Sequence, residues 1–200
     1  LGYKVLPVVA GEKRPAVAHG VYDATDDREK IDRFWNSRPN YNVAIATAGL
    51  VVIDVDNRNS SSWPNDPDLA ADLALSAGAI SITPSGGRHY FFRKPTGREI
   101  RCSVGAIADN VDVRSDGGYV LVPPSVVSGN SYVWVRDREI VSGPNSLPEP
   151  PEWLINLIVS STSSNGRSHA ESDTIKSVIP EGVRNDSLFR IGCRLRRIAL

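Results

Sequence analysis

The chain has 200 residues, with 23 basic and 23 acidic side chains, so its formal net charge at pH 7 is zero. A chain of this length can bury its own core, and the 2 cysteines lack the nearby Cys or His partners that a zinc site requires. We therefore expect no zinc, and the net charge by itself gives no electrostatic support for nucleic-acid binding.

The sequence contains no apolar run near the roughly 18 residues that cross a membrane, and no leader like a signal peptide. We expect a cytoplasmic protein without a membrane partner. The chain begins without Met inside an apolar strand pattern and stops inside a helical one. We interpret it as a fragment of a longer polypeptide.

Short β-rich runs alternate with helical runs in the first half, which is typical of a mixed α/β or α+β fold. A strand is predicted over 3–9, and a helix over Asp27–Asn36 with Thr25 as its N-cap. Two apolar runs, 43–46 and 50–56, are separated by three small residues and are predicted to pair as a hairpin.

The middle of the chain continues with a polar loop over 57–65 and a helix over 68–76. A second hairpin is predicted between 79–83 and 88–92, joined by a Pro-Ser-Gly-Gly turn. The remaining predicted elements are strands over 110–114, 119–122 and 131–136, and an amphipathic helix over 152–159 that follows a proline-rich stretch.

Composition predicts three segments. Residues 1–160 form the main domain. Residues 161–175 are Ser-rich and low in apolar content, which indicates a linker. Residues 176–200 contain an apolar-periodic helix and are interpreted as the start of a truncated helical module.

The sharpest motif is Asp54-Val55-Asp56, which directly follows the apolar run Leu50–Ile53. Because side chains alternate along a strand, both carboxylates leave the same face, about 7 Å apart at the backbone. Two such carboxylates after a buried run are costly unless they share a cation, and a pair of divalent metals about 4 Å apart suits them. For so short a motif, a strand end that turns into a polar loop is the alternative.

A glycine turn precedes the strand that carries His89. Gly86 and Gly87 lack a Cβ, so backbone N–H groups there can approach phosphate oxygens, and Arg88 and His89 offer side-chain donors. The alternative is an ordinary Pro-Ser-Gly-Gly hairpin turn with a histidine at its edge.

The third motif is Val111-Asp112-Val113-Arg114, in which Asp112 and Arg114 share the face opposite the two valines. A third carboxylate would complete an oxygen ligand set suited to Mg²⁺ or Mn²⁺, and Arg114 could counter a triphosphate. An Asp–Arg pair on a solvated face is the alternative.

The order of these motifs resembles the archaeo-eukaryotic primase superfamily. More narrowly, it resembles the bifunctional DNA primase/polymerase (prim-pol) domain at the N-terminus of plasmid and phage replication proteins. The resemblance runs from Tyr3 to about Leu157, and 182–185 is similar to the start of the helical primase C-terminal module that follows such domains.

The resemblance implies an α+β primase-polymerase fold, with an RRM-like catalytic sheet and a second α/β module that forms a cleft. It implies that Asp54, Asp56 and Asp112 are the catalytic carboxylates and bind two divalent ions, Mg²⁺ or Mn²⁺. His89 would contact the phosphates of the incoming nucleotide. The superfamily's second motif is Ser-x-His, whereas Gly87 stands two residues before His89 here and the serine is Ser85. This departure counts against a side-chain hydroxyl role at the motif and leaves the backbone-amide role intact.

The residues expected to bind the nucleotide share a position in or beside these motifs, with Lys13 as a weaker candidate for a phosphate or template contact. They are His89, Arg88, Gly87, Gly86, Ser85, Arg114 and Ser125.

The implied activity is DNA primase-polymerase: template-directed transfer of NTP or dNTP to a 3′-hydroxyl, making or extending primers on single-stranded DNA. The expected setting is the cytosol of a bacterial or archaeal host, with a helicase domain on the same polypeptide. Two functions of other classes stay open. A metal-dependent nuclease would use the same carboxylates without a nucleotide-phosphate pocket, and a non-catalytic single-stranded nucleic-acid-binding module would stack bases on aromatic side chains.

Overall fold

The computed structural model describes residues 1–57 and 63–164. Within these residues the strands form three antiparallel sheets of three, six and two strands, accompanied by three α-helices. The predicted α+β class agrees with this mixture of antiparallel sheets and few helices.

The strands of each sheet come from distant parts of the chain. The three-stranded sheet has the order β1 (Val5–Val8), β2 (Asn42–Ala46), β8 (Tyr119–Val122). The six-stranded sheet has the order β11 (Val133–Trp134), β4 (Ala79–Ile82), β5 (Arg88–Arg93), β3 (Leu50–Val55), β7 (Val111–Arg114), β6 (Ser103–Ala108). The two-stranded sheet pairs β9 (Val126–Val127) with β10 (Asn130–Ser131).

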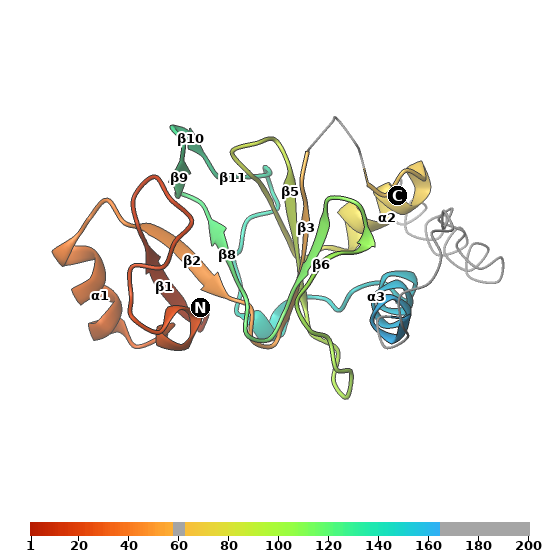
Figure 1. Cartoon of the computed structure of the whole chain (residues 1–200), viewed down its shortest axis with the longest axis horizontal. Helices are drawn as coiled ribbons and strands as arrows, with labels where there is room; N and C mark the ends of the chain where they lie inside the picture. The colour runs from red at the N-terminus through yellow and green to blue at the C-terminus, as the bar shows by residue number, and fades with distance from the viewer. Residues whose placement is uncertain (58–62, 165–200) are drawn as a thin grey trace, which may run out of the picture.

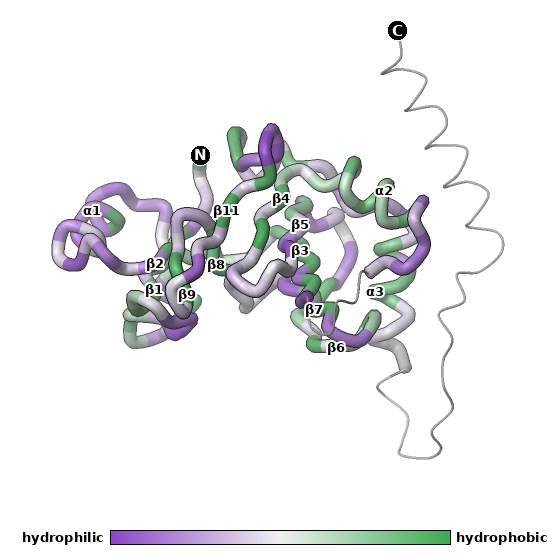
Figure 2. The backbone as a smooth tube through the Cα atoms, turned by 90° about the horizontal axis from the view of Figure 1, so that it is seen from above, coloured by the Kyte–Doolittle hydropathy of each residue, from purple (hydrophilic) through white to green (hydrophobic). Residues whose placement is uncertain are grey.

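The helices lie on the outer sides of the two larger sheets (Figure 1). The helix beside the three-stranded sheet is α1 (Arg28–Ser37), and the helices on the far side of the six-stranded sheet are α2 (Pro67–Ser76) and α3 (Glu152–Ser164). Two 3-10 turns, η1 (Gly20–Asp23) and η3 (Pro144–Ser146), complete the elements. In Figure 2, α1 is largely hydrophilic, and none of its residues is buried.

The six-stranded sheet is covered on both faces. Its inner strand β3 has buried apolar side chains on each face. On one face, Val51 and Ile53 pack with Leu73 of α2 and Leu154 of α3. On the other face, the apolar residues contact the three-stranded sheet, as in the cluster of Leu50, Val52 and Phe91 of the larger sheet with Ile45, Val120 and Val122 of the smaller one. Sheet therefore packs on sheet on one side and helix on sheet on the other.

The predicted hairpin between 43–46 and 50–56 is wrong. The structure puts β2 and β3 in different sheets, and β2 pairs with β1 and β8 instead. The three residues between β2 and β3 form a tight turn, in which the N–H of Leu50 donates to the carbonyl of Thr47 at 3.0 Å, and this turn carries the chain from one sheet to the other. Both runs are apolar on both faces, so their pattern identified strands but not partners.

Three smaller predictions also differ. The N-cap of α1 is Asp27, whose carboxylate accepts from the N–H groups of Glu29 and Lys30, whereas the Thr25 hydroxyl accepts from the N–H of Asp27. The strand β6 was not predicted, since its sequence includes a glycine at positive φ. The predicted strand over 131–136 is divided between β10 and β11.

The last helix, α3, is longer than predicted. It continues to Ser164, beyond the expected end at 159. The hydroxyls of Ser160, Ser161 and Thr162 donate to carbonyls three residues earlier, so these polar side chains are satisfied on the helix itself. The rest of the predicted linker, to 175, and the predicted helical module over 176–200 lie outside the described residues, as do residues 58–62 of the predicted polar loop.

Candidate active site

The candidate residues meet on three neighbouring strands of the six-stranded sheet. Asp54 of β3 is the register partner of His89 on β5 and of Asp112 on β7. On the next strand, β4, the partner of His89 is Ser81. Residues directly opposite in antiparallel strands project from the same face, so these four side chains form one row across the sheet, which we call the polar row.

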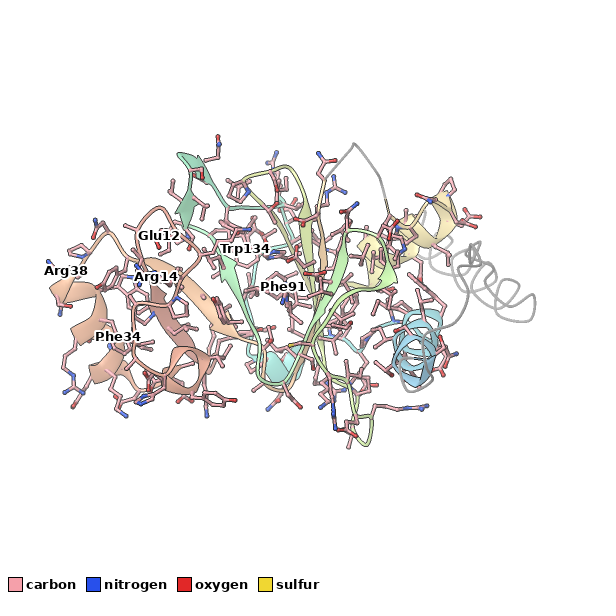
Figure 3. The ribbon with its side chains drawn as sticks, viewed as in Figure 1. Glu12, Arg14, Phe34, Arg38, Phe91 and Trp134 are labelled. Carbon is pink, nitrogen blue, oxygen red and sulfur yellow. The ribbon has the colours of Figure 1, made fainter. Side chains whose placement is uncertain are left out.

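The polar row lies on the face of the six-stranded sheet that packs against the three-stranded sheet. It directly follows the apolar residues of that face. Val52 precedes Asp54 on this face, and Phe91 follows His89. Figure 3 labels Phe91 and Trp134, whose rings lie 5.7 Å apart between the two sheets. The apolar cluster therefore borders the polar row and removes it partly from water.

Each carboxylate of the row lies beside a nitrogen-bearing side chain. Nε2 of His89 lies 3.3 Å from Oδ1 of Asp54, and these side chains are 4% and 20% exposed. Nη2 of Arg114 lies 2.6 Å from Oδ2 of Asp112, with exposures of 32% and 19%. The other Asp112 oxygen accepts from the N–H of Gly105 at 3.1 Å. The side chains of both acids are therefore mostly buried, but each keeps some contact with solvent.

Asp56 follows the end of β3 by one residue. Its N–H donates to the carbonyl of Asn110 at 2.9 Å, so the ladder between β3 and β7 continues beyond the last strand residue. If the alternation of the strand continues through this residue, Asp56 shares the face of Asp54.

Charges from three elements act on Asp54. Burial raises the pKa of the Asp54 carboxyl, but the hydrogen bond from His89 and the surrounding positive charges together hold that pKa below its ordinary value. The charges come from His89, Arg114 and Lys13. The site therefore favours an ionised Asp54 and has donors on more than one side of it.

Lys13 reaches this site from the loop that follows β1. Figure 3 labels its neighbours Glu12 and Arg14, which pair with each other at 3.2 Å. Two hydrogen bonds from the three-stranded sheet hold this loop. The Asn42 side chain donates to the carbonyl of Glu12 at 3.1 Å, and the Tyr119 hydroxyl donates to the carbonyl of Lys13 at 3.0 Å. The sequence identified Lys13 only weakly, because its proximity to Asp54 depends on these long-range contacts.

Tyr132 is part of the site and was missed by the sequence analysis. Its ring lies 5.8 Å from that of His89, and its side chain is buried. Burial and, secondarily, the negative charges of Asp54 and Asp56 raise the pKa of Tyr132 to about 12. Nothing local in the Tyr132-Val133-Trp134 segment indicates contact with the acids.

The glycine turn before His89 is tightly built. The N–H of Gly86 donates to the carbonyl of Thr83, and the Ser85 hydroxyl lies 3.1 Å from the Thr83 hydroxyl. A Cβ at Gly87 would collide with the carbonyl oxygen of Val55, which is why the turn can lie directly against the end of β3. The turn thus brings its backbone beside the two aspartates of that strand.

Two predicted nucleotide-binding residues have other surroundings. Arg88 is the register partner of Val55, so it projects from the face opposite His89 and is exposed. The buried Ser125 hydroxyl donates to the carbonyl of Val43 and accepts from its N–H, both at 2.9 Å. Ser125 therefore joins the end of β8 to β2, and neither residue belongs to the polar row.

The donor types fit divalent cations, since Mg²⁺ and Mn²⁺ prefer carboxylate oxygens. Asp54 and Asp112 are cross-strand neighbours, and Asp56 shares their face. Within residues 1–57 and 63–164, no group of three His, Cys, Asp or Glu side chains is gathered as a metal-ligand set, and Asp112 contacts Arg114 and Gly105. The three acids are candidates for a shared metal site by residue type and face.

A cavity of about 390 Å³ lies elsewhere, beside the N-terminus, and its lining includes Tyr3, Ile31, Ile45, Trp134 and Ile140. None of the candidate residues lines it. Its walls are mainly apolar, with Asp26 as the one carboxylate among the lining residues. The candidate site is therefore identified by its charged side chains rather than by this cavity.

Comparison with known families gives one match. The family described as bifunctional DNA primase/polymerase, N-terminal, matches residues 1–153, which include every element from β1 to the start of α3. Curated proteins gave no match. Among the helices that the structure describes, none is long and apolar enough to cross a membrane.

Proposed function

Because the chain belongs to the bifunctional DNA primase/polymerase N-terminal family, we propose that it transfers nucleotides to a 3′-hydroxyl on a single-stranded DNA template and so makes or extends primers. The family implies a DNA primase/polymerase enzyme with DNA and nucleotides as substrates. The finer parts of the proposal are the metals, the single-stranded template and the roles of individual residues.

The carboxylates provide the metal side of the proposed site. Asp54, Asp56 and Asp112 would hold two divalent ions, Mg²⁺ or Mn²⁺. Such ions, when bound, supply activation of the attacking 3′-hydroxyl and neutralisation of charge on the pyrophosphate that leaves. The chain's own contribution is a sheet that fixes the spacing of Asp54 and Asp112, together with neighbours that favour the ionised form of Asp54.

The cationic groups provide the phosphate side. His89, Arg114 and Lys13 surround Asp54 from three elements, so a triphosphate that approaches the acids meets donors from the sheet and from the β1 loop. The backbone at Gly86 and Gly87 lies beside the end of β3 and can bring N–H groups near the same phosphates. Arg88 has no part in this proposal, since it projects from the other face.

The observation that carries the proposal is the polar row itself. A histidine and two aspartates distant in sequence are direct cross-strand neighbours on the half-buried face of one sheet, inside a domain of the primase/polymerase family. An RRM-like catalytic sheet and a second α/β module that forms a cleft are also part of the proposal. A helicase domain on the same polypeptide and a cytoplasmic location remain proposals that follow from the family.

The test is nucleotide incorporation on a single-stranded DNA template, with Mg²⁺ or Mn²⁺, with and without an annealed primer. The native chain is compared with Asp54→Ala/Asp56→Ala and with Asp109→Asn, an exposed carboxylate near Asp112 that serves as a matched control. We expect incorporation by the native chain and the control, and none by the double variant.

The outcomes separate the possible functions. Products formed without a primer would establish priming in addition to extension. Metal-dependent degradation of the template without incorporation would replace the proposal with a nuclease. Template binding with neither activity would favour the non-catalytic binding module.

A further inference from the structure

The polar row contains two buried polar atoms that lack a partner. Among the described residues, neither Oγ of Ser81 nor Nδ1 of His89 has a hydrogen bond, although Ser81 is fully buried and His89 is 3% exposed. An unpaired polar atom in such surroundings is unfavourable, so a pair of them side by side requires an explanation.

Geometry makes the two atoms neighbours. Ser81 and His89 are register partners on β4 and β5, which puts their Cβ atoms roughly 5 Å apart on the same face of the sheet. At that separation a serine hydroxyl reaches an imidazole nitrogen by rotation of its side chain or through one water molecule.

Chemistry makes the two atoms complementary. Nε2 of His89 faces the ionised Asp54 at 3.3 Å, so in a neutral ring Nε2 carries the proton and Nδ1 is an acceptor. A hydroxyl can donate to that acceptor. Ser81 is therefore the type of residue that stabilises the Nε2–H form of His89.

The other surfaces of the ring are occupied by aromatic groups. Tyr132 lies 5.8 Å away at a tilt of 42°, and Phe91 lies 6.2 Å away with its ring nearly perpendicular. These contacts limit how the imidazole can turn, but they do not select which nitrogen is protonated. Asp54 favours a proton on Nε2 from one side of the ring, and Ser81, on the strand next to His89, is placed to donate to Nδ1 from the other.

We propose that Ser81 is a positioning residue, whose hydroxyl donates to Nδ1 of His89 and thereby keeps the proton of the ring on Nε2, the nitrogen that faces Asp54 here and that would meet the phosphates of the incoming nucleotide. The role of His89 at the phosphates rests on the proposed function, whereas the contact between Ser81 and His89 does not. In this chain a serine hydroxyl thus supports the histidine from the neighbouring strand, although Gly87 occupies the position two residues before it.

The experiment measures the tautomer and the kinetics separately in the full 200-residue chain. Long-range ¹H–¹⁵N spectra of chains with ¹⁵N-labelled histidine report which nitrogen of each ring is protonated, and His89→Gln identifies the signals of His89. For Ser81→Ala we expect a shifted Nδ1 resonance and a smaller share of the Nε2–H form. The KM for the nucleotide should rise roughly two- to tenfold, the effect of one hydrogen bond, with kcat nearly unchanged.

Two further variants provide controls. Ser81→Thr keeps the hydroxyl and should restore the native spectrum and KM. Ser81→Cys is close in size but donates weakly, so it should resemble Ser81→Ala in both measurements and serves as the test if the alanine variant fails to fold. Thermal unfolding of each variant identifies any loss of structure.

The results distinguish this inference from the proposed function. A native Nδ1 resonance and tautomer in a folded Ser81→Ala or Ser81→Cys chain would overturn the role of Ser81, even if the enzyme primes DNA. A changed tautomer in a chain whose native form incorporates no nucleotide would support the contact and overturn the proposed function instead.

Discussion

The two faces of strand β3 are built from alternate residues of one short segment, yet they differ in chemistry where the strand ends. On the face toward the helices, Val51, Ile53 and Val55 are all buried and all join one apolar cluster. On the face toward the three-stranded sheet, Leu50 and Val52 are buried in the same way, but the next residue is Asp54, which is ionised and half-shielded.

This difference explains how the sheet can hold charged side chains at fixed positions. The helix-covered face remains apolar for the full length of the strand, and α2 and α3 lock together behind it through a hydrogen bond of 2.8 Å from the Trp153 indole to the Asp72 carboxylate. That continuous packing fixes the backbone of β3. The acid at the end of the opposite face is therefore held in place by the strand and needs no deep burial of its own side chain. We therefore expect the two faces to respond differently to substitution: activity should depend on one and stability on the other.

The largest expected effect is on activity, for Asp112→Asn. The amide can still accept from the N–H of Gly105 but loses its charge toward the proposed metals, so incorporation should fall about a thousandfold, or about 4 kcal/mol. Nucleotide incorporation and thermal unfolding are measured together, with Asp109→Asn as the control. Unchanged incorporation by Asp112→Asn would remove this acid from the catalytic set.

The matching change on the other face is Ile53→Ala. Ile53 is fully buried among apolar side chains, so its truncation should lower the free energy of unfolding by about 2–5 kcal/mol. Denaturant unfolding measures the loss, and incorporation per folded molecule should stay near the native value. A large loss of activity at full folding would show that the two faces are not independent.

A smaller effect is expected where the glycine turn meets β3. Gly87→Ala puts a methyl group against the carbonyl oxygen of Val55, which should cost about 1–3 kcal/mol and displace the neighbouring His89. Gly97→Ala provides the comparison, because Gly97 has a positive φ but no atom within 4 Å of its Cβ position, whereas Gly87 has the close contact without a positive φ. Native stability of Gly87→Ala in denaturant unfolding would show that the turn does not depend on its close approach to β3.

The smallest expected effect concerns the charge environment of Asp54. Removal of a cation by Lys13→Met should raise the pKa of Asp54 toward its ordinary value, while Lys30→Met on the exposed helix α1 should leave it unchanged. Carbon-13 NMR titration of the carboxyl groups, in the presence of a chelator, measures the shift. An identical pKa in the native chain and in Lys13→Met would show that the β1 loop does not act on the site.

The sign of the accompanying stability change follows from the lowered pKa. The folded state favours ionised Asp54, so this group stabilises the protein at pH values above its unfolded pKa of about 3.9. The contribution is lost as the pH falls through the lower folded pKa. Lys13→Met should therefore reduce stability near neutral pH more than at pH 2.

Much of the fold was visible in the sequence because its elements have strong local patterns. The apolar runs predicted β1, β3, β5, β7 and β8, and the Pro-Ser-Gly-Gly turn correctly predicted the pairing of β4 with β5. The weakly patterned β6 and the division between β10 and β11 were missed, since a glycine and short polar interruptions conceal such strands. The family, too, followed from the order of the motifs, and the comparison confirmed it.

The sequence by itself determined which residues share a face, because alternation along a strand is a local property. It could therefore have separated Arg88 from His89, which are adjacent in β5 and project to opposite sides. Only the tertiary structure decided which strands are neighbours: it separated β2 from β3, and it aligned Ser81, His89, Asp54 and Asp112 in one row. It also brought Lys13 and Tyr132 to the acids, since such contacts depend on the packing of distant segments, which no local pattern encodes.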